Sequence, residues 1–147
     1  MGLLPTLNTY KTEDNVRNFL IKEFPRLVIM AGYSMVDVKS PRFSATPKST
    51  PVGNGVENNM VGHIDAPRIV DAVILTIKHC PADYCTILTM AYIQGLKDEI
   101  IIDRVPYERS QYYKLKSAAL RYFADGFTKI YDLHVYENRT ESGLLSD

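Results

Sequence analysis

The apolar spacing across residues 96–127 constrains the fold of this chain more than any other stretch. A short helix is predicted at residues 99–104, with Ile101 and Ile102 on its inner side. A second, longer helix is predicted to begin near Glu108, because apolar residues then recur at spacings of three and four. Its inner stripe consists of Tyr112, Leu115, Ala119, Tyr122 or Phe123, and Phe127. The stretch therefore predicts two helices joined by a tight turn.

The N-terminal part shows the same helical period. A helix is predicted to start at Glu13, where the Thr12 hydroxyl can accept a free amide of the first turn. Proline removes an internal hydrogen bond and clashes with the preceding turn, so Pro25 predicts a kink or two short helices. Gly32 is expected to end this segment in a left-handed conformation.

Two further helices are predicted between residues 65 and 95. Asp65 is expected to cap the first, with Pro67 in its first turn, where a missing amide costs nothing. Pro81 is expected to open the second, and Gly95 to end it. No alternating strand pattern of useful length occurs, so the predicted fold class is all-α.

Composition divides the chain into four parts. These are an N-terminal helical segment at 1–33, an irregular linker at 34–64, a helix-turn-helix bundle at 65–130, and a tail at 131–147. The linker is rich in Pro, Gly, Ser, Thr and Asn and has no periodicity. The chain after Phe127 is expected to continue the last helix and then to end in polar, frayed sequence.

The overall charge carries little information, because 17 basic residues balance 17 acidic ones. Locally, residues 104–121 hold five Lys or Arg and a single acid, Glu108. The N-terminus lacks the pattern of a secretory signal, and no apolar run approaches the roughly 18 residues of a membrane span. We therefore expect a soluble protein of the cytoplasm that has no membrane partner.

No pattern of catalytic or metal-binding residues is supported by spacing. Cys80 and Cys85 lack the matching second pair of a zinc site, and two cysteines without an export signal favour neither a metal nor a disulfide framework. Asp98, Glu99 and Asp103 are interpreted as acids that suit the positive end of a helix dipole. We expect no enzymatic activity and no cofactor.

The outer face of the last predicted helix is polar and basic. If Tyr112, Leu115 and Ala119 face inward, the opposite face carries Arg109, Ser110, Tyr113, Lys114 and Ser117. A helix of this kind fits a major groove about 12 Å wide. Arg109 suits a bidentate contact with guanine, and Gln111 suits an adenine or a phosphate.

Three more basic residues flank that face. Lys116, Arg121 and Arg104 are predicted to contact phosphates, which position a protein without specifying sequence. The simpler alternative is a solvated amphipathic helix whose charges only keep the protein soluble. The pattern alone slightly favours this simpler alternative, because basic helix faces are common.

A series of short strings resembles the ArpU family of phage-encoded transcriptional regulators from Gram-positive bacteria. In chain order the strings are FPRL, DVKSPRFSATPKS, IDAPRIVDAV, DRVPY and SQYYKLKSAALRYFADGF. In that family the C-terminal half is similar to region four of bacterial sigma factors. The resemblance spans nearly the whole chain, from about residue 15 to residue 127.

The resemblance implies a phage or prophage regulator of late genes for packaging or lysis, which binds promoter DNA through a sigma-like helix-turn-helix. Its base and phosphate contacts would fall on Arg109, Ser110, Tyr113 and Lys114. Implied partners are double-stranded DNA and RNA polymerase, with the N-terminal segment as a candidate site of homo-oligomerisation.

The chain departs from the family pattern at two positions. Pro106 replaces a turn glycine and cannot adopt a positive φ, so the turn must be built differently. Glu108 replaces a capping serine. Two other functions stay open: a small terminase-like DNA-packaging subunit, and a helical protein-interaction module that does not bind DNA.

Overall fold

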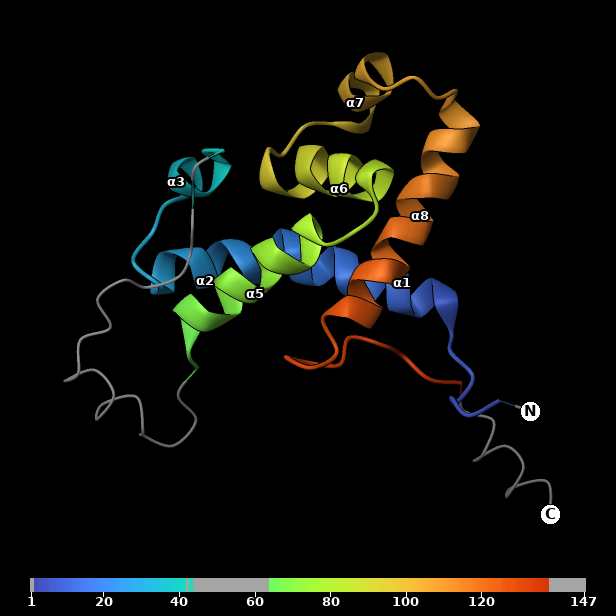
Figure 1. The fold of residues 1–147 in the computed structure, drawn as a ribbon, viewed down its shortest axis with the longest axis horizontal. Coiled ribbons are helices and arrows are strands. Elements are labelled where there is room, and N and C mark those ends of the chain that lie inside the picture. Colours follow the sequence, from blue (N-terminus) through green and yellow to red (C-terminus); the bar gives the residue numbers. More distant parts are fainter. Residues whose placement is uncertain (1, 42, 44–63, 138–147) are drawn as a thin grey trace.

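The computed structural model describes residues 2–41, 43 and 64–137, and this part of the chain is all-α, as predicted (Figure 1). The helices are α1 (Thr9–Asn18), η1 (Phe19–Glu23), α2 (Phe24–Met30), α3 (Met35–Lys39), α5 (Ala66–Lys78), α6 (Ala82–Leu88), η2 (Thr89–Ile93), α7 (Asp98–Arg104) and α8 (Arg109–Gly126). Among the described residues, extended structure occurs as an isolated antiparallel bridge between Leu7 and Tyr136. Most of the predicted linker and the end of the predicted tail lie outside the described residues.

The first helix begins earlier than predicted. Asn8 is its N-cap, and the Asn8 side chain accepts a hydrogen bond from the Lys11 amide at 2.9 Å. Thr12, the predicted cap, is instead buried inside α1, and its hydroxyl accepts from the Val135 amide at 3.0 Å. Thr12 therefore serves tertiary packing, because Asn8 already caps the helix.

Pro25 is accommodated by a change of helical pitch. The π-helical turn η1 precedes it, and the Phe24 amide reaches back to the Phe19 carbonyl. Pro25 then occupies the first turn of α2, where its missing amide leaves no broken bond. A kink or two short helices were predicted; the structure has α1 and α2 with η1 between them and no break in the helical chain. Gly32 ends the segment with a φ of 91°.

The boundaries between residues 65 and 95 also follow the sequence. Asp65 caps α5 through the Arg68 amide at 3.4 Å, and Gly95 follows η2 with a φ of 69°. The helix α3 was not predicted, since five residues are too few to show apolar periodicity. Its N-terminus is a capping box, in which Ser34 and Asp37 exchange side-chain and backbone hydrogen bonds.

The core is built where α8 meets the N-terminal helices and α5. Phe19 lies 5.3 Å from Phe127 and 6.5 Å from Phe123, measured between ring centres. In Figure 1 the lower end of α8 crosses α1, while α5 lies beside α2. The domain boundaries drawn from composition stay predictions, and buried side chains from both sides of them share this core.

The chain after α8 does not continue the helix, so that prediction was wrong. The helix ends at Gly126 and residues 127–130 form a turn. The chain then returns along the N-terminus, where Tyr136 forms the bridge with Leu7. The Asn8 amide donates to the Val135 carbonyl at 2.8 Å, and the Asn15 side chain donates to the Leu133 carbonyl at 2.8 Å. Leu133 is buried, so the apolar spacing that suggested a helix reflects packing against α1.

His134 fastens this returning segment to the end of α8. Its two ring nitrogens lie 2.7 Å from carboxylate oxygens of Asp125 and Asp132, and its side chain is only 9% exposed. Burial lowers the pKa of His134, but the hydrogen bonds and charges of the two aspartates outweigh it, so the pKa is raised. Within the described ranges, no helix has both the length and the apolar character needed to cross a bilayer.

The shared core leads to a first prediction. Phe19→Ala should lower the free energy of unfolding by about 3 to 5 kcal/mol, because it removes a buried ring that contacts two others. Unfolding of this variant should still occur in one common transition, whether it is followed by helix content in circular dichroism or by tyrosine fluorescence. The control Tyr10→Ala, at an exposed site of α1, should change stability by less than about 0.5 kcal/mol. Separate transitions for the two probes would contradict the shared core.

A second prediction concerns pH. Because the pKa of His134 is raised on folding, its stabilisation is complete below the ordinary value of 6.5 and is lost as pH rises through the folded pKa. His134→Gln should therefore lower Tm more at pH 6 than at pH 8.5, measured by thermal melts. The exposed His79→Gln is the matched control and should show no such difference. A His134→Gln effect that is equal at both pH values would refute the assignment.

Candidate nucleic-acid interface

The two helices at the upper right of Figure 1, α7 and α8, are joined by a turn of four residues. Ile101 of α7 and Tyr112 of α8 are fully buried and form a small core with Ile87 of α6. Tyr107 in the turn donates a hydrogen bond to Asp83 of α6. The turn is thereby held against a helix outside the pair.

The turn is built without a left-handed residue. Among the described residues, positive φ angles occur only at Gly32 and Gly95, so Pro106 and its neighbours all have negative φ. Glu108 is the N-cap of α8 in an extended conformation, and its carbonyl accepts from the Tyr112 amide at 2.9 Å. Its carboxylate makes no capping hydrogen bond. The predicted helix start is confirmed.

The structure separates the two faces of α8 much as the apolar spacing predicted. Tyr112 and Ala119 are fully buried, and Leu115 is half-buried. The predicted reading residues Arg109, Ser110, Gln111, Tyr113 and Lys114 are all exposed, whereas Ser117 is half-buried. The first turns of α8 therefore present one continuous polar surface, which we call the α8 N-terminal face: residues 109–111, 113 and 114.

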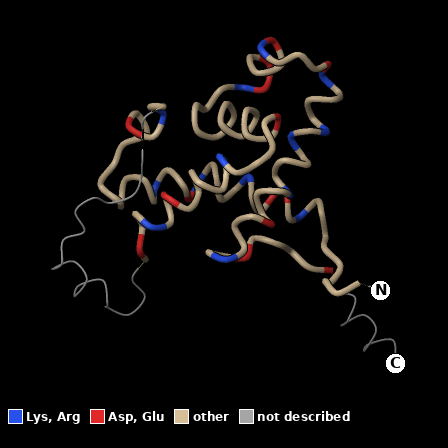
Figure 2. Tube along the Cα trace, viewed as in Figure 1, with Lys and Arg blue, Asp and Glu red and all other residues tan. Residues whose placement is uncertain are grey.

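The five basic side chains of residues 104–121 are less free than the sequence suggested. Blue and red segments lie close together where α8 meets its neighbours in Figure 2. Three of the five side chains, Arg109, Lys116 and Arg121, form ion pairs with acids. In the part of the chain that the structure describes, no acid pairs with Arg104 or Lys114. The local positive charge is thus partly neutralised.

Arg109 forms a bidentate pair with Glu99 of α7. Its two terminal nitrogens donate to the two carboxylate oxygens, each at 2.8 Å. The hydrogen bonds from Arg109 lower the pKa of Glu99. Both side chains are largely exposed, at 57% and 67%, so the pair lies at the protein surface.

Lys116 is engaged inside the helix pair rather than offered to solvent. Its ammonium lies 2.7 Å from Asp98 and 5.5 Å from the centre of the Tyr92 ring, and its side chain is 14% exposed. The Tyr112 hydroxyl donates to the same aspartate oxygen at 2.6 Å. Burial raises the pKa of Asp98, but the bonds from Lys116 and Tyr112 outweigh it and lower the pKa overall.

Arg121 of α8 and Arg104 of α7 are the other two residues that were predicted to contact phosphates. Arg121 donates to the buried Glu13 at 2.6 Å and so ties α8 to α1, away from the α8 N-terminal face. Arg104 is exposed at the last position of α7, close to the turn. Of the three predicted phosphate contacts, only Arg104 has a side chain that no acid engages among the described residues.

The roles of Asp98 and Glu99 were not foreseen. They do begin a helix, as the dipole argument expected, but their carboxylates pair with α8. For Asp103 that expectation was wrong, because it lies next to the last residue of α7, at the negative end of the dipole. The sequence did carry a sign of this pairing: acids open the short helix α7, and basic residues follow near the start of α8. Pairing them requires the crossing of the two helices, which spacing alone does not supply.

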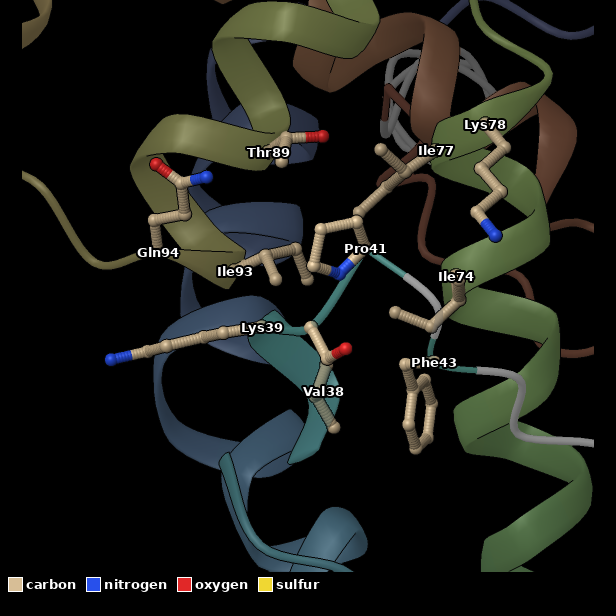
Figure 3. Close-up of a pocket in the computed structure, with 11 residues that line it drawn as sticks. Val38, Lys39, Pro41, Phe43, Ile74, Ile77, Lys78, Thr89, Ile93 and Gln94 are labelled. Carbon is tan, nitrogen blue, oxygen red and sulfur yellow. The ribbon is translucent and has the colours of Figure 1, made fainter. Parts of the chain in front are cut away.

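Two other features that could bind a ligand lie outside α7 and α8: the cysteines and a cavity. Within the described residues, no cluster of three or more His, Cys, Asp or Glu could hold a metal ion. Cys80 is buried, and burial raises its pKa to about 11, so its thiol stays protonated at neutral pH. A cavity of about 210 Å³ has a lining that includes Val38, Ile74 and Ile93. Figure 3 draws and labels these side chains. None of the predicted DNA-contact residues lines it.

A third prediction tests the bond between α7 and α8. Asp98→Asn and Lys116→Met should each lower the free energy of unfolding by about 1 to 2 kcal/mol, because each leaves a partly buried charge without its partner. The double variant should lose less than the sum, as measured by a urea double-mutant cycle. Additive losses would mean that the two side chains do not interact.

The chain has a curated relative that matches over most of its length. It is 30% identical to the "Putative autolysin regulatory protein ArpU" of Enterococcus hirae over 129 residues, which is 86% of this chain and 93% of that protein. No family model matches the chain, and no solved structure matches it. The identity and the coverage of both proteins agree with the resemblance carried by its sequence strings. This chain belongs to the ArpU family.

Proposed function

We propose that this chain is a transcriptional regulator that binds duplex DNA through α7 and α8, used as a helix-turn-helix. The observation that carries the proposal is the α8 N-terminal face. Its five side chains, in the first turns of α8, are exposed, while the other face of the helix is buried. A helix presented in this way can place side chains on base edges in a major groove. The regulatory name of the Enterococcus hirae relative supports the same function.

Within this proposal, the role of each residue follows from its position and its burial. Arg109 would contact guanine, and Gln111 an adenine or a phosphate. Ser110, Tyr113, Lys114 and Ser117 complete the contact surface, with Arg104 on a flanking phosphate. Lys116 and Arg121 would contribute less than the sequence suggested, since Lys116 is nearly buried against Asp98 and Arg121 is bound to the buried Glu13 of α1, away from the α8 N-terminal face.

The proposed setting is the cytoplasm of a bacterial host, with the gene carried by a phage or prophage. The regulated genes would be late genes for packaging or lysis, and the name of the relative refers to an autolysin. RNA polymerase is the proposed protein partner. The N-terminal helices carry exposed apolar side chains, including Ile21 and Ile29, which suit a contact between two copies.

A fourth prediction separates base contacts from phosphate contacts. By fluorescence anisotropy, Arg109→Ala should reduce the preference for a duplex selected from a random pool by about ten- to a hundredfold. Lys114→Ala should weaken selected and random duplexes alike and reduce the log–log salt slope by about 0.9. The exposed Lys129→Ala, beyond the end of α8, is the control. Equal effects of the Arg109 and Lys114 variants would refute the division.

The two alternative functions predict different results for the same purified protein. A small terminase-like subunit would form a large closed ring, visible by light scattering. A protein-interaction module would bind no duplex, yet would keep its partner when Arg109 and Lys114 are both alanine. A sequence preference carried by a small oligomer would support the regulator.

A further inference from the structure

We infer that Glu99 is a specificity-determining residue: by holding Arg109, it disfavours contacts with phosphate more than contacts with a base edge. This inference rests on the proposed DNA binding and goes beyond it, because it assigns a role to an acid of α7.

The pair fixes both the position and the plane of the Arg109 guanidinium. Two parallel N–H···O bonds of 2.8 Å join the second residue of α7 to the first residue of α8. A fork of this kind restricts rotation about the bonds of the arginine side chain. Arg109 is thus held at the end of α8 that opens the proposed reading surface.

Folding stability does not account for this pair. With side chains 57% and 67% exposed, both ions remain in water, where such pairs contribute little. The neighbouring Asp98 already links the two helices through Tyr112 and the nearly buried Lys116. The consequence of the Glu99 contact therefore lies in what Arg109 can do at the surface.

Charge decides which ligands the held arginine accepts. Arginine has five N–H donors, and Glu99 occupies one on each terminal nitrogen, so three remain. A phosphate that approaches them brings its negative charge close to the Glu99 carboxylate. The edge of guanine offers two neutral acceptors and meets much less repulsion. Glu99 therefore favours base reading over non-specific binding.

The test compares Glu99→Gln with Asp103→Asn, which removes the same charge from another exposed position of α7. Anisotropy titrations use a random 30-base-pair duplex and a duplex selected by the wild-type protein. Freeing Arg109 for one phosphate should strengthen binding of the random duplex about eightfold at 0.1 M salt and steepen the salt slope by about 0.9. Binding of the selected duplex should change less, so its preference falls.

Each outcome decides a different point. If Glu99→Gln matches Asp103→Asn on both duplexes, the inference is overturned and the proposed DNA binding stands. If the wild-type protein binds neither duplex, both fail together. The thermal melt is the check on folding: Glu99→Gln should keep the wild-type Tm, while Asp98→Asn lowers it. A Tm loss as large as that of Asp98→Asn would make Glu99 structural and overturn the inference.

Discussion

The structure depends on how the C-terminal half of α8 is buried. Phe123 and Phe127 stack at 5.1 Å between ring centres, and both contact Phe19 from the N-terminal helices. Ala119, Leu120 and Ala124 are also fully buried, so a broad face of this half of the helix is enclosed. Because a helix is stiff over 18 residues, enclosing one half fixes the direction in which the other half projects.

The projecting half is then shaped by charge. Asp98 draws Lys116 and Tyr112 inward, and Glu99 holds Arg109 at the surface. A DNA-binding surface that kept all five local cations free would gain affinity for any duplex, since phosphate contacts are independent of sequence. Internal pairing of three of them leaves a surface whose proposed affinity depends more on base contacts. Folding would thus draw on Asp98, and the proposed specificity on its neighbour Glu99.

The sequence predicted the all-α class, the caps at Asp65 and Gly95, and the buried positions of Tyr112 and Ala119, because these follow from local spacing and backbone chemistry. It did not predict α3, which is too short to show a period, or the return of the chain through Leu133. The partners of Glu99 and Asp98 were also missed. They depend on how helices cross, and no single stretch of sequence encodes that crossing.

An NMR titration of the 15N-labelled protein with a selected duplex tests most directly whether α8 reads DNA. The largest backbone amide shift changes should fall on residues 109–114, with smaller changes in the turn at 105–108. Residues of α1, which lie against the enclosed half of α8, should change little. Changes concentrated on the N-terminal helices, or none on α8, would contradict the claim that this helix reads DNA.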